Sequence, residues 1–456
     1  MSGVGFVLRA EARLPDGATS GMRSAAQGIV WIGVFVGVCV APLAFALIGA
    51  SRTGQGFWTD FSVALGFVGL ALMGLEFALV ARVRAVAEPF GTDAVVQFHR
   101  QIGYVGLSFV VVHVALSGPG VFGAFGLAEL PWRARFAVLS VVALLVLAVT
   151  SVWRRRLRLS YEVWQVVHAV TAAVAVVAAL VHVLLVDHYL DSAWKKALWT
   201  LMTAAFVGLL LWIRILRPLR LRRRPWSVER VIAERGRITV LVLRPRGHDG
   251  LRFEPGQFAW ITVGGSPFAV TAHPFSLASS AEEHGTLSVA VKALGDFTTA
   301  VAATKPGTTV YVDGPHGVFS IDQYEGPGFC LIAGGVGLVP ALSMLRTMAD
   351  RGDLRPVVLL SAHPDWDSIP FREELDELAT RLNLTLVHVL EQPPPGWSGE
   401  RGYVTAETLR RHLPAAGPRL QYFVCGPNAM LDAMEATLPQ VGVPLDRIHT
   451  ERFTWV

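Results

Sequence analysis

The chain has 456 residues, of which 52% are hydrophobic and only 16% are charged, and its formal net charge is +5. Soluble proteins of this length rarely carry so few charges, so we expect part of the chain to lie in a lipid bilayer. Its arginines flank apolar segments, as topology signals do, and this argues against a nucleic-acid partner. Three cysteines, Cys39, Cys330 and Cys425, have the spacing of neither a disulfide framework nor a zinc site.

Six apolar segments precede residue 217, and each is about 20 residues long, enough for a helix to span about 30 Å of hydrocarbon. They lie near residues 28–50, 57–81, 97–117, 135–153, 162–186 and 195–216. The first is too long for a cleaved signal peptide, so residues 1–27 are expected to form a cytosolic N-terminal segment. Arginines gather on one side of the spans, notably in "WRRRLR" (153–158) and "RILRPLRLRRR" (214–224). The positive-inside rule therefore predicts an integral protein of the plasma or inner membrane with both termini in the cytoplasm.

Four histidines stand inside the third and fifth spans, where polar side chains are costly. His99 and His113 are 14 residues apart, and so are His168 and His182. Fourteen residues bring a helix back to nearly the same face, about 21 Å further along its axis. The two spans run in the same direction, so side-by-side packing would place His99 level with His168 (the inner pair) and His113 level with His182 (the outer pair).

Two facing imidazoles suit the axial positions of a six-coordinate haem, so the pattern predicts two haem b groups stacked across the membrane. Zinc is less suitable, because no carboxylate or thiolate completes a tetrahedral site at either level. Each histidine alone could instead be a buried residue hydrogen-bonded to a neighbour. His188, six residues beyond the outer pair's second histidine, is expected to be a bystander. Arg100 could bind a haem propionate or simply mark the cytoplasmic boundary.

After Arg224 the hydrophobic runs shorten to strand length. "RITVLVLRP", "FAWITVG" and "GTLSVAVKAL" predict an antiparallel β-barrel over 225–324. From residue 326 to 456, strand and helix patterns alternate, as in "FCLIAGG", "LVPALSMLRTMAD" and "PVVLLSAH", which predicts an α/β domain with a parallel sheet. The expected fold is a multi-domain membrane protein, with a six-helix transmembrane bundle (28–217), a cytosolic barrel domain and a cytosolic nucleotide-binding domain.

The stretch "TAHPFSLASS" (271–280) resembles the flavin-binding motif of the ferredoxin-reductase superfamily. The resemblance implies that Phe275 packs against the isoalloxazine, that Ser276 hydrogen-bonds near flavin N5 and that His273 approaches the phosphates. "EPGQF" (254–258), "VKALGDFTTAV" (291–301) and "GPHGVFS" (314–320) resemble further segments of that superfamily. Taken alone, Phe275 could be a core aromatic residue and the Gly-Asp pair an ordinary turn and cap.

Within "VKALGDFTTAV" a helix is expected to begin after Gly295 and Asp296. Its backbone N–H groups and the hydroxyls of Thr298 and Thr299 can then face a pyrophosphate. The predicted FAD-binding residues of these two segments are His273, Pro274, Phe275, Ser276, Lys292, Gly295, Asp296, Thr298 and Thr299.

The stretch "LIAGGVGLVPALSML" (331–345) predicts a strand, a glycine-rich turn and a helix whose N-terminus favours a phosphate. A glycine-rich turn alone is a weak indication of a nucleotide. Followed by "VCGPNAML" (424–431), it matches the pyridine-nucleotide domain of the same superfamily, which implies that Cys425 lies beside the nicotinamide. Taken alone, Cys425 could be a small buried residue. The predicted NAD(P)H-binding residues are Gly334, Gly335, Gly337, Pro340, Cys425, Gly426 and Pro427.

The chain ends in "ERFTWV". Members of the superfamily often place a terminal aromatic residue over the flavin, which implies this role for Phe453, with Trp455 as the alternative. The residues predicted to take part directly in the chemistry are Phe453, Cys425 and Ser276.

Taken together, the paired histidines, "HPFS", "GGVGLVP" and "CGP" resemble the membrane-spanning ferric reductase and NADPH oxidase family over residues 28–456, in a minimal prokaryotic-type form. The resemblance implies electron transfer from cytosolic NAD(P)H through FAD and two haems to an outer acceptor, with dioxygen giving superoxide as the first hypothesis. A ferric chelate is the second, and a haem-free transporter or scaffold with a flavin domain is the third. His363 stands where relatives often carry an arginine for a 2′-phosphate and Arg372 could substitute, so the choice of nucleotide is open. Membrane lipid and the acceptor are the expected partners.

Overall fold

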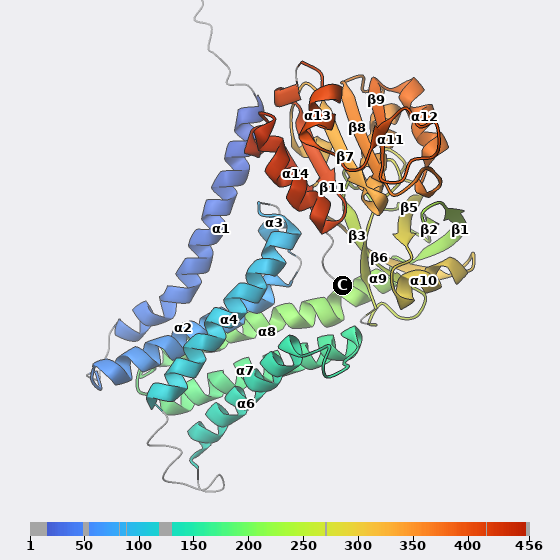
Figure 1. Cartoon of the computed structure of the whole chain (residues 1–456). Helices are drawn as coiled ribbons and strands as arrows, with labels where there is room; N and C mark the ends of the chain where they lie inside the picture. Colours follow the sequence, from blue (N-terminus) through green and yellow to red (C-terminus); the bar gives the residue numbers. More distant parts are fainter. Residues whose placement is uncertain are drawn as a thin grey trace, which may run out of the picture.

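The computed structural model describes residues 16–48, 54–81, 83–87, 89–117, 130–269, 271–415 and 417–452. Within these ranges, six helices are long and apolar enough to cross a membrane, which confirms the predicted number of spans. They are α1 (Asp16–Leu47), α2 (Phe57–Leu79), α4 (Thr92–Ser117), α6 (Trp132–Val152), α7 (Tyr161–Val186) and α8 (Ala193–Leu211), with a short α3 (Arg84–Ala87) after α2. Figure 1 shows the helical bundle on one side of the molecule and two sheet domains on the other.

The first and last membrane helices extend beyond the predicted spans. α1 already begins at Asp16, whereas the apolar run begins near residue 28. α8 continues through the π-helix η1 (Trp212–Leu216) into α9 (Arg217–Arg222). Arginine and leucine are good helix formers, and long arginine side chains keep their charge in water, so the basic stretch prolongs the helix. The sixth helix therefore leads straight from the bundle to the first sheet domain (Figure 1).

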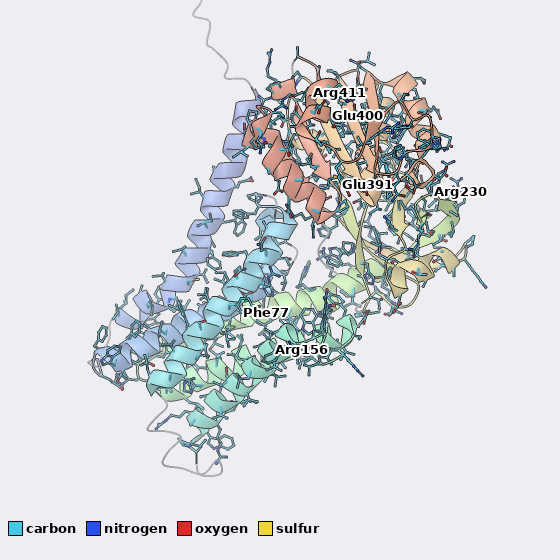
Figure 2. All side chains as sticks on the ribbon, viewed as in Figure 1. Phe77, Arg156, Arg230, Glu391, Glu400 and Arg411 are labelled. Carbon is cyan, nitrogen blue, oxygen red and sulfur yellow. The ribbon has the colours of Figure 1, made fainter. Side chains whose placement is uncertain are left out.

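α2 is the most buried of the membrane helices in the described part of the chain. Its glycines permit close packing: a Cβ at Gly74 would lie 2.2 Å from Cδ2 of Phe206 on α8, and one at Gly69 would lie 3.2 Å from Cγ2 of Val110 on α4. Small residues take this role in membrane helices because lipid gives no hydrophobic drive for association. Figure 2 shows side chains as sticks and labels Phe77 of α2, which is buried inside the bundle.

The first soluble domain is a six-stranded antiparallel sheet in the order β4-β3-β6-β1-β2-β5. Its strands are β1 (Trp226–Glu234), β2 (Ile238–Pro245), β3 (Phe258–Val263), β4 (His273–Ser276), β5 (Leu287–Lys292) and β6 (Thr309–His316). A bridge between Leu277 and Val289 joins the two edges, so the sheet curls into a barrel. Alternate residues such as Leu241 and Leu243 fill its interior. The short helix α10 (Asp296–Ala300) follows β5.

The second soluble domain is a six-stranded sheet in the order β10-β9-β8-β7-β11-β12, in which every neighbouring pair is parallel. Its strands are β7 (Phe329–Gly334), β8 (Val357–His363), β9 (Leu384–Leu390), β10 (Glu400–Arg401), β11 (Gln421–Cys425) and β12 (Ile448–Glu451). The chain moves outward from β7 in one direction and then crosses to β11 on the other side. Ligands bind at such a switch point, beyond the carboxyl ends of the strands.

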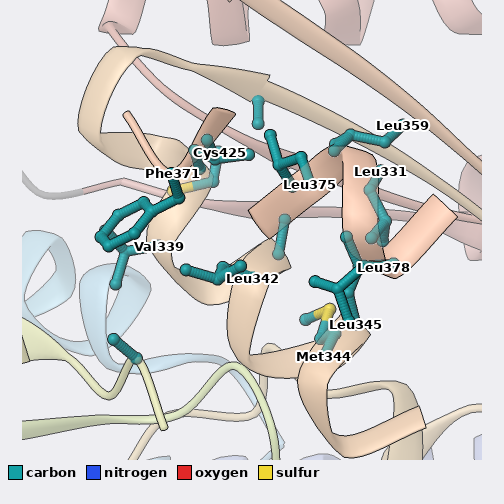
Figure 3. Close-up of a cluster of buried hydrophobic side chains, with 14 of the residues drawn as sticks. Leu331, Val339, Leu342, Met344, Leu345, Leu359, Phe371, Leu375, Leu378 and Cys425 are labelled. Atoms are coloured by element: carbon teal, nitrogen blue, oxygen red, sulfur yellow. The ribbon is translucent and has the colours of Figure 1, made fainter. Parts of the chain in front are cut away.

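Helices cover both faces of this parallel sheet. α11 (Leu338–Arg351) and α12 (Arg372–Arg381) pack on one face, and α13 (Ala406–His412) and α14 (Asn428–Gln440) pack on the other. Figure 3 shows the first of these cores, where Leu342 of α11 and Leu375 of α12 lie near Leu331 of β7. Parallel strands need such cover because both of their faces are apolar.

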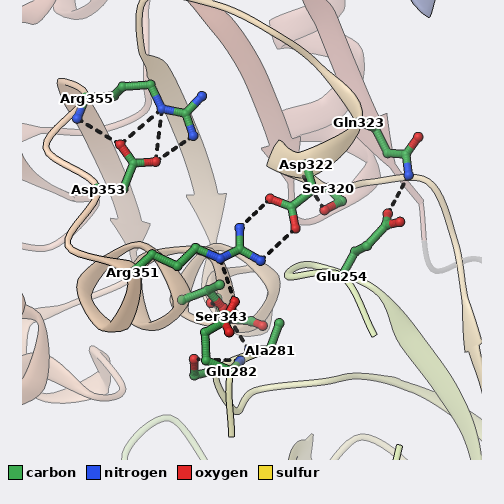
Figure 4. A network of polar contacts seen from close by, with 12 residues as sticks. Glu254, Ala281, Glu282, Ser320, Asp322, Gln323, Ser343, Arg351, Asp353 and Arg355 are labelled. Atoms are coloured by element: carbon green, nitrogen blue, oxygen red, sulfur yellow. Dashed lines mark hydrogen bonds and ion pairs between the residues drawn. The ribbon is translucent and has the colours of Figure 1, made fainter. Parts of the chain in front are cut away.

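Polar contacts join the two soluble domains along α11 (Figure 4). Arg351 pairs with Glu282 at 2.6 Å and with Asp322, also at 2.6 Å. The Ser343 hydroxyl donates to the backbone carbonyl of Ser279 at 2.8 Å. These contacts hold the barrel against the N-terminal part of the nucleotide domain, so the two predicted cofactor sites keep a fixed relation.

Candidate functional site

The inner histidine pair lies at the end of the bundle nearest the soluble domains. His99 of α4 faces His168 of α7, and their ring centroids are 6.3 Å apart. A metal–imidazole bond is about 2 Å long, so two imidazoles that share one metal ion have centroids about 6 Å apart. The spacing therefore suits one haem iron between the two rings.

The outer pair lines a cavity between α2, α4, α6 and α7. His113 and His182 both contribute to its wall, and its volume is about 130 Å³. A Cβ at Gly66 would lie 3.1 Å from Nδ1 of His113, so the glycine leaves room for the imidazole. The rest of the wall is mostly valine, leucine and alanine. The apolar wall and the two imidazoles are the surroundings that a haem needs.

The Nδ1 atoms of His113, His182 and His168 each lie within hydrogen-bond distance of an oxygen, which orients those rings. In the outer pair, His113 Nδ1 lies 2.8 Å from the carbonyl oxygen of Ser62, and His182 Nδ1 lies 2.8 Å from that of Arg133. A carbonyl oxygen only accepts hydrogen bonds, so Nδ1 carries the proton and Nε2 keeps its lone pair for a metal. In the inner pair, His168 Nδ1 lies 3.0 Å from the Ser151 hydroxyl. His99 Nδ1 contacts the Glu76 carboxylate.

These Nδ1 partners are absent from the sequence-based prediction. Glu76 had a visible signal, because a carboxylate inside an apolar span is rarely placed without a role. The backbone carbonyls of Ser62 and Arg133 had none, since every residue carries a carbonyl group. In the described ranges, no group of three or more His, Cys, Asp or Glu side chains could hold a bare metal ion.

His188 and Arg100, two further side chains near the histidine pairs, lie in different surroundings. His188, expected to be a bystander, lies beyond the end of α7 and lines the same cavity as the outer pair. Its Nε2 is buried and has no hydrogen-bond partner among the described residues. Arg100 beside His99 is exposed. Phe453 and Trp455 lie outside the described residues.

The predicted flavin motif forms β4 at one edge of the barrel, next to β3. His273, Pro274 and Phe275 are half-buried, while Ser276 is buried opposite Phe258. Phe297 of α10 stacks on the His273 ring at 4.1 Å between centroids, and lies 6.3 Å from the Phe275 ring. The sequence prediction missed Phe297, although an aromatic residue directly after Gly-Asp was visible in the motif. These rings form a half-buried aromatic surface that suits a planar ring system.

At the predicted phosphate site, the Thr298 hydroxyl has partners within its own turn. The Thr298 hydroxyl oxygen accepts hydrogen bonds from the backbone N–H groups of Leu294 and Gly295, both at 2.9 Å. The hydroxyl also donates to the Gly295 carbonyl oxygen at 3.0 Å. Thr298 therefore caps its own helix, and these two N–H groups are not directed at a ligand. Asp296 and Thr299 lie on the same exposed turn.

The two predicted nucleotide-binding segments meet at the switch point of the parallel sheet. Cys425 ends β11 opposite Ala333 of β7. A Cβ at Gly337 would lie 2.2 Å from the carbonyl oxygen of Cys425, and one at Gly334 would lie 2.9 Å from Cδ of Pro427. The glycine-rich turn and the "CGP" segment are therefore in direct backbone contact. Pro340 is buried in the first turn of α11, and Gly426 packs against Gly334.

Lys292 lies between the two predicted cofactor sites. A Cβ at Gly335 would lie 3.5 Å from Nζ of Lys292, so this lysine of the barrel reaches the glycine-rich turn. Cys425 is 3% exposed, and burial together with the nearby Glu451 carboxylate raises the pKa of its thiol well above the usual value. The thiol is therefore neutral at physiological pH.

The barrel contacts the membrane bundle close to the inner pair. Arg217 of α9 pairs with Asp313 of β6 at 2.7 Å and donates to His316 at 3.1 Å. Burial lowers the pKa of His273, and the Glu162 carboxylate at the start of α7 opposes this shift. Trp164 lies on α7 one helical turn before His168, and their ring centroids are 5.2 Å apart. The flavin motif is thus next to the helix that carries His168.

Comparisons with known proteins assign each of the three domains. Residues 65–180 match the family described as "Ferric reductase like transmembrane component", residues 232–320 match "FAD-binding domain", and residues 331–436 match "Oxidoreductase NAD-binding domain". NADH-cytochrome b5 reductase 1 of Aspergillus terreus is 32% identical over 228 residues, covering 46% of this chain and 75% of that protein. The Neosartorya fischeri protein of the same name is 30% identical over 228 residues, covering 46% and 72%.

Together, the three family models match a ferric reductase/NADPH oxidase-like flavocytochrome. Among solved structures, the FAD/NAD-binding domain of Vibrio cholerae nitric oxide dioxygenase is 24% identical, with a TM-score of 0.45, covering 50% of this chain and 98% of that one. The chain is an integral membrane oxidoreductase with FAD-binding and NAD(P)H-binding domains.

Arg217→Ala is expected to slow electron delivery from the flavin domain to the membrane domain about tenfold or more, because a small misplacement of reacting groups is costly. Flavin reduction by NADH, measured by stopped flow, should stay unchanged. Arg222→Ala is the matched control, since Arg222 is exposed on the same helix and should be silent. Equal rates of acceptor reduction in both variants would contradict a coupling role for the Arg217–Asp313 pair.

Proposed function

We propose that this chain carries electrons across a membrane, from NADH on the side of its soluble domains to dioxygen on the other side, giving superoxide. The observation that carries the proposal is the arrangement of four imidazoles in two pairs, in which carbonyl oxygens hold Nδ1 of His113 and His182 and leave their Nε2 atoms for iron. Such second-shell contacts fix the tautomer and orientation of a histidine that binds a metal.

The proposed cofactors follow from the chemistry of the electron donor and of the electron acceptor. Bound FAD would convert the two-electron hydride of NADH into single electrons, and bound haem would carry these singly across the bilayer. His99 and His168 would hold the inner haem, and His113 and His182 the outer. The aromatic surface at β4, with Ser276 beside it, would hold the flavin ring. The glycine-rich turn and Lys292 would hold the phosphates of the nucleotide.

The arginine distribution supports a cytoplasmic position of the soluble domains. Figure 2 labels Arg156 in the turn between α6 and α7, at the end of the bundle nearest the barrel. The cluster in α9 lies at the same end. Basic loops of membrane proteins stay in the cytoplasm, so both described ends of the chain would lie there.

The cavity at the outer pair favours dioxygen over a ferric chelate. Its lining includes no lysine, arginine, aspartate or glutamate among the described residues. A small apolar molecule could reach the edge of a haem held by such a wall, whereas a charged chelate would need cationic or anionic side chains to bind.

Two measurements on the purified protein test this proposal. A dithionite-reduced minus oxidised spectrum should show b-type haem, at two haems per chain by extraction. NADH should then drive dye reduction that superoxide dismutase suppresses. Dye reduction insensitive to superoxide dismutase, together with faster turnover on ferric citrate, would support the ferric-chelate alternative. A sample without haem would overturn the proposal in favour of a transporter or scaffold.

We expect NADH to be preferred over NADPH about tenfold or more in kcat/KM, a difference of about 1.4 kcal/mol. His363 is 2% exposed, and burial lowers its pKa to about 4, so it is neutral at physiological pH and offers a 2′-phosphate no charge. The Arg372 guanidinium lies 4.3 Å from the Trp366 ring centroid and donates to the Trp366 carbonyl oxygen. The loop between them carries Asp365 and Asp367, which would repel a phosphate.

Steady-state kinetics with both nucleotides between pH 6 and 8 check this preference. The ratio should be constant over this range, because His363 gains its proton only near pH 4. Arg372→Ala should raise KM for the two nucleotides equally. A selective rise for NADPH would show that Arg372 leaves Trp366 to bind the 2′-phosphate, and would contradict the prediction.

A further inference from the structure

We propose that the turn between α6 and α7, residues 153–160, binds the phosphate group of an anionic phospholipid. The lipid belongs to the leaflet on the side of the soluble domains. The inference goes beyond the proposed electron transfer and is independent of it, because the lipid site needs neither haem nor flavin.

The turn carries a cluster of unpaired positive charge. Its sequence is "WRRRLRLS", which contains four arginines and no acidic residue. Arg154 is held over α7, with its guanidinium carbon 5.4 Å from the Tyr161 ring centroid. The side chains of Arg155, Arg156 and Arg158 are exposed, and they make no hydrogen bond or ion pair with any residue that the structure describes. Cations this close repel one another, so an anion bound between them is stabilising.

A hollow of about 530 Å³ lies against this turn, and its wall includes Arg154, Arg155 and Arg156. Residues 151–153 complete the wall. Glu162, the nearest acidic residue in the sequence, acts on Arg154, so the charges of Arg155 and Arg156 are left for a ligand. One guanidinium can bind two phosphate oxygens at once. The hollow therefore has both the room and the charge for a phosphate group.

The position of the turn and its apolar residues favour a lipid over a soluble anion. The membrane-spanning part of α6 ends at Val152 and that of α7 begins at Tyr161, so the turn lies at the level of the lipid headgroups. Trp153 and Leu157 are 46% and 47% exposed. Beside a lipid, these two side chains contact its apolar chains while the arginines contact its phosphate. A soluble anion would leave both apolar side chains in water.

A topology signal alone does not require this arrangement. The positive-inside rule counts arginines near the ends of the spans, whether or not they surround one hollow. Arg158 also has φ +53°, a left-handed conformation that is costly for a residue with a Cβ atom. Such strain is typical of segments that clamp a ligand.

Native mass spectrometry of the full-length protein in detergent tests the proposal. Phosphatidylglycerol and phosphatidylcholine are added in equal amounts. Both carry a phosphate, but only phosphatidylglycerol has a net negative charge, so the protein should retain it about tenfold more often. Equal retention of the two lipids by the unsubstituted protein would overturn the proposal.

Arg155→Gln/Arg156→Gln should remove this preference, whereas Arg155→Lys/Arg156→Lys should keep most of it because the charge remains. The matched control is Arg222→Gln/Arg223→Gln, which removes two exposed arginines at the same end of the bundle and should leave the preference unchanged. An equal loss in both glutamine variants would mean that the lipid responds to surface charge in general, and the proposal would be wrong. If the Arg155→Gln/Arg156→Gln protein does not fold, the single variant Arg156→Gln decides, and an unchanged preference there overturns the proposal.

Inorganic phosphate distinguishes a lipid headgroup from a free anion. Replacing chloride by phosphate at constant ionic strength should leave the retained phosphatidylglycerol unchanged, because free phosphate lacks the apolar chains that Trp153 and Leu157 contact. Loss of the lipid on this exchange would assign the hollow to a free phosphate ion instead.

Discussion

Replacing His113 by leucine is expected to halve the haem content, from two per chain to one, and to reduce delivery of electrons to the outer acceptor at least 100-fold. Leucine has no atom that can bind iron, and the neighbouring Ser62 cannot replace the lost ligand. The first steps use other residues, so flavin reduction by NADH should keep its rate. Haem extraction and stopped-flow absorbance at the flavin wavelength measure the two quantities. The expected factor follows the 10–100-fold that even second-shell changes cost at metal sites.

His188→Leu is the control for this variant, because His188 lines the same cavity without facing His182 from the opposite helix. It should retain both haems. If His113→Leu keeps two haems and full acceptor reduction, the pairing of His113 with His182 is wrong. Retention of two haems by His113→Leu but not by His188→Leu would assign the ligand to His188.

Gly337→Ala is expected to abolish NADH-dependent flavin reduction, because the new methyl group would overlap backbone atoms of the "CGP" segment. Its Cβ would lie 2.2 Å from the Cys425 carbonyl oxygen and 2.8 Å from the Gly426 nitrogen. Both are backbone atoms at the end of β11, a central strand, so they cannot move aside as a flexible side chain would. We expect one of two results. Either the nucleotide domain loses about 4 kcal/mol of stability, or it folds with the glycine-rich turn and the "CGP" segment pushed apart. Thermal unfolding and stopped-flow flavin reduction measure these effects.

Gly352→Ala is the matched control in the same domain. Gly352 ends α11 at φ +64°, and a Cβ there would have no atom within 4 Å. Its substitution should cost only the strain of a left-handed conformation, about 1 kcal/mol, and leave the KM for NADH unchanged. Normal nucleotide binding by Gly337→Ala would show that the two segments can separate without loss of function.

The sequence predicts the large-scale organisation well because the signals are long and periodic. Six apolar runs indicate six helices, and their number is confirmed within the described ranges. The ends are less accurate, since "RILRPLRLRRR" continues a helix where a loss of hydropathy suggests a boundary. Composition identifies a lipid-facing segment but does not identify the residue at which its helix ends.

At the candidate sites, the sequence identifies the residues that chemistry requires but not the groups that orient them. The 14-residue spacing places His99 opposite His168, and the two rings do face each other. The carbonyl of Arg133, by contrast, depends on how α6 packs against α7, which no local pattern encodes. Phe297 was overlooked for a similar reason, because its stacking on His273 joins two elements far apart in the chain.

The short passage from α9 to β1 has a consequence for the kinetics of the whole chain. α9 ends at Arg222 and β1 begins at Trp226, so three residues join the bundle to the reductase module. A tether of this length allows no search by diffusion. Transfer between the module and its bundle should therefore follow first-order kinetics that dilution of the protein in lipid does not slow, unlike the encounter of a free reductase with a separate cytochrome.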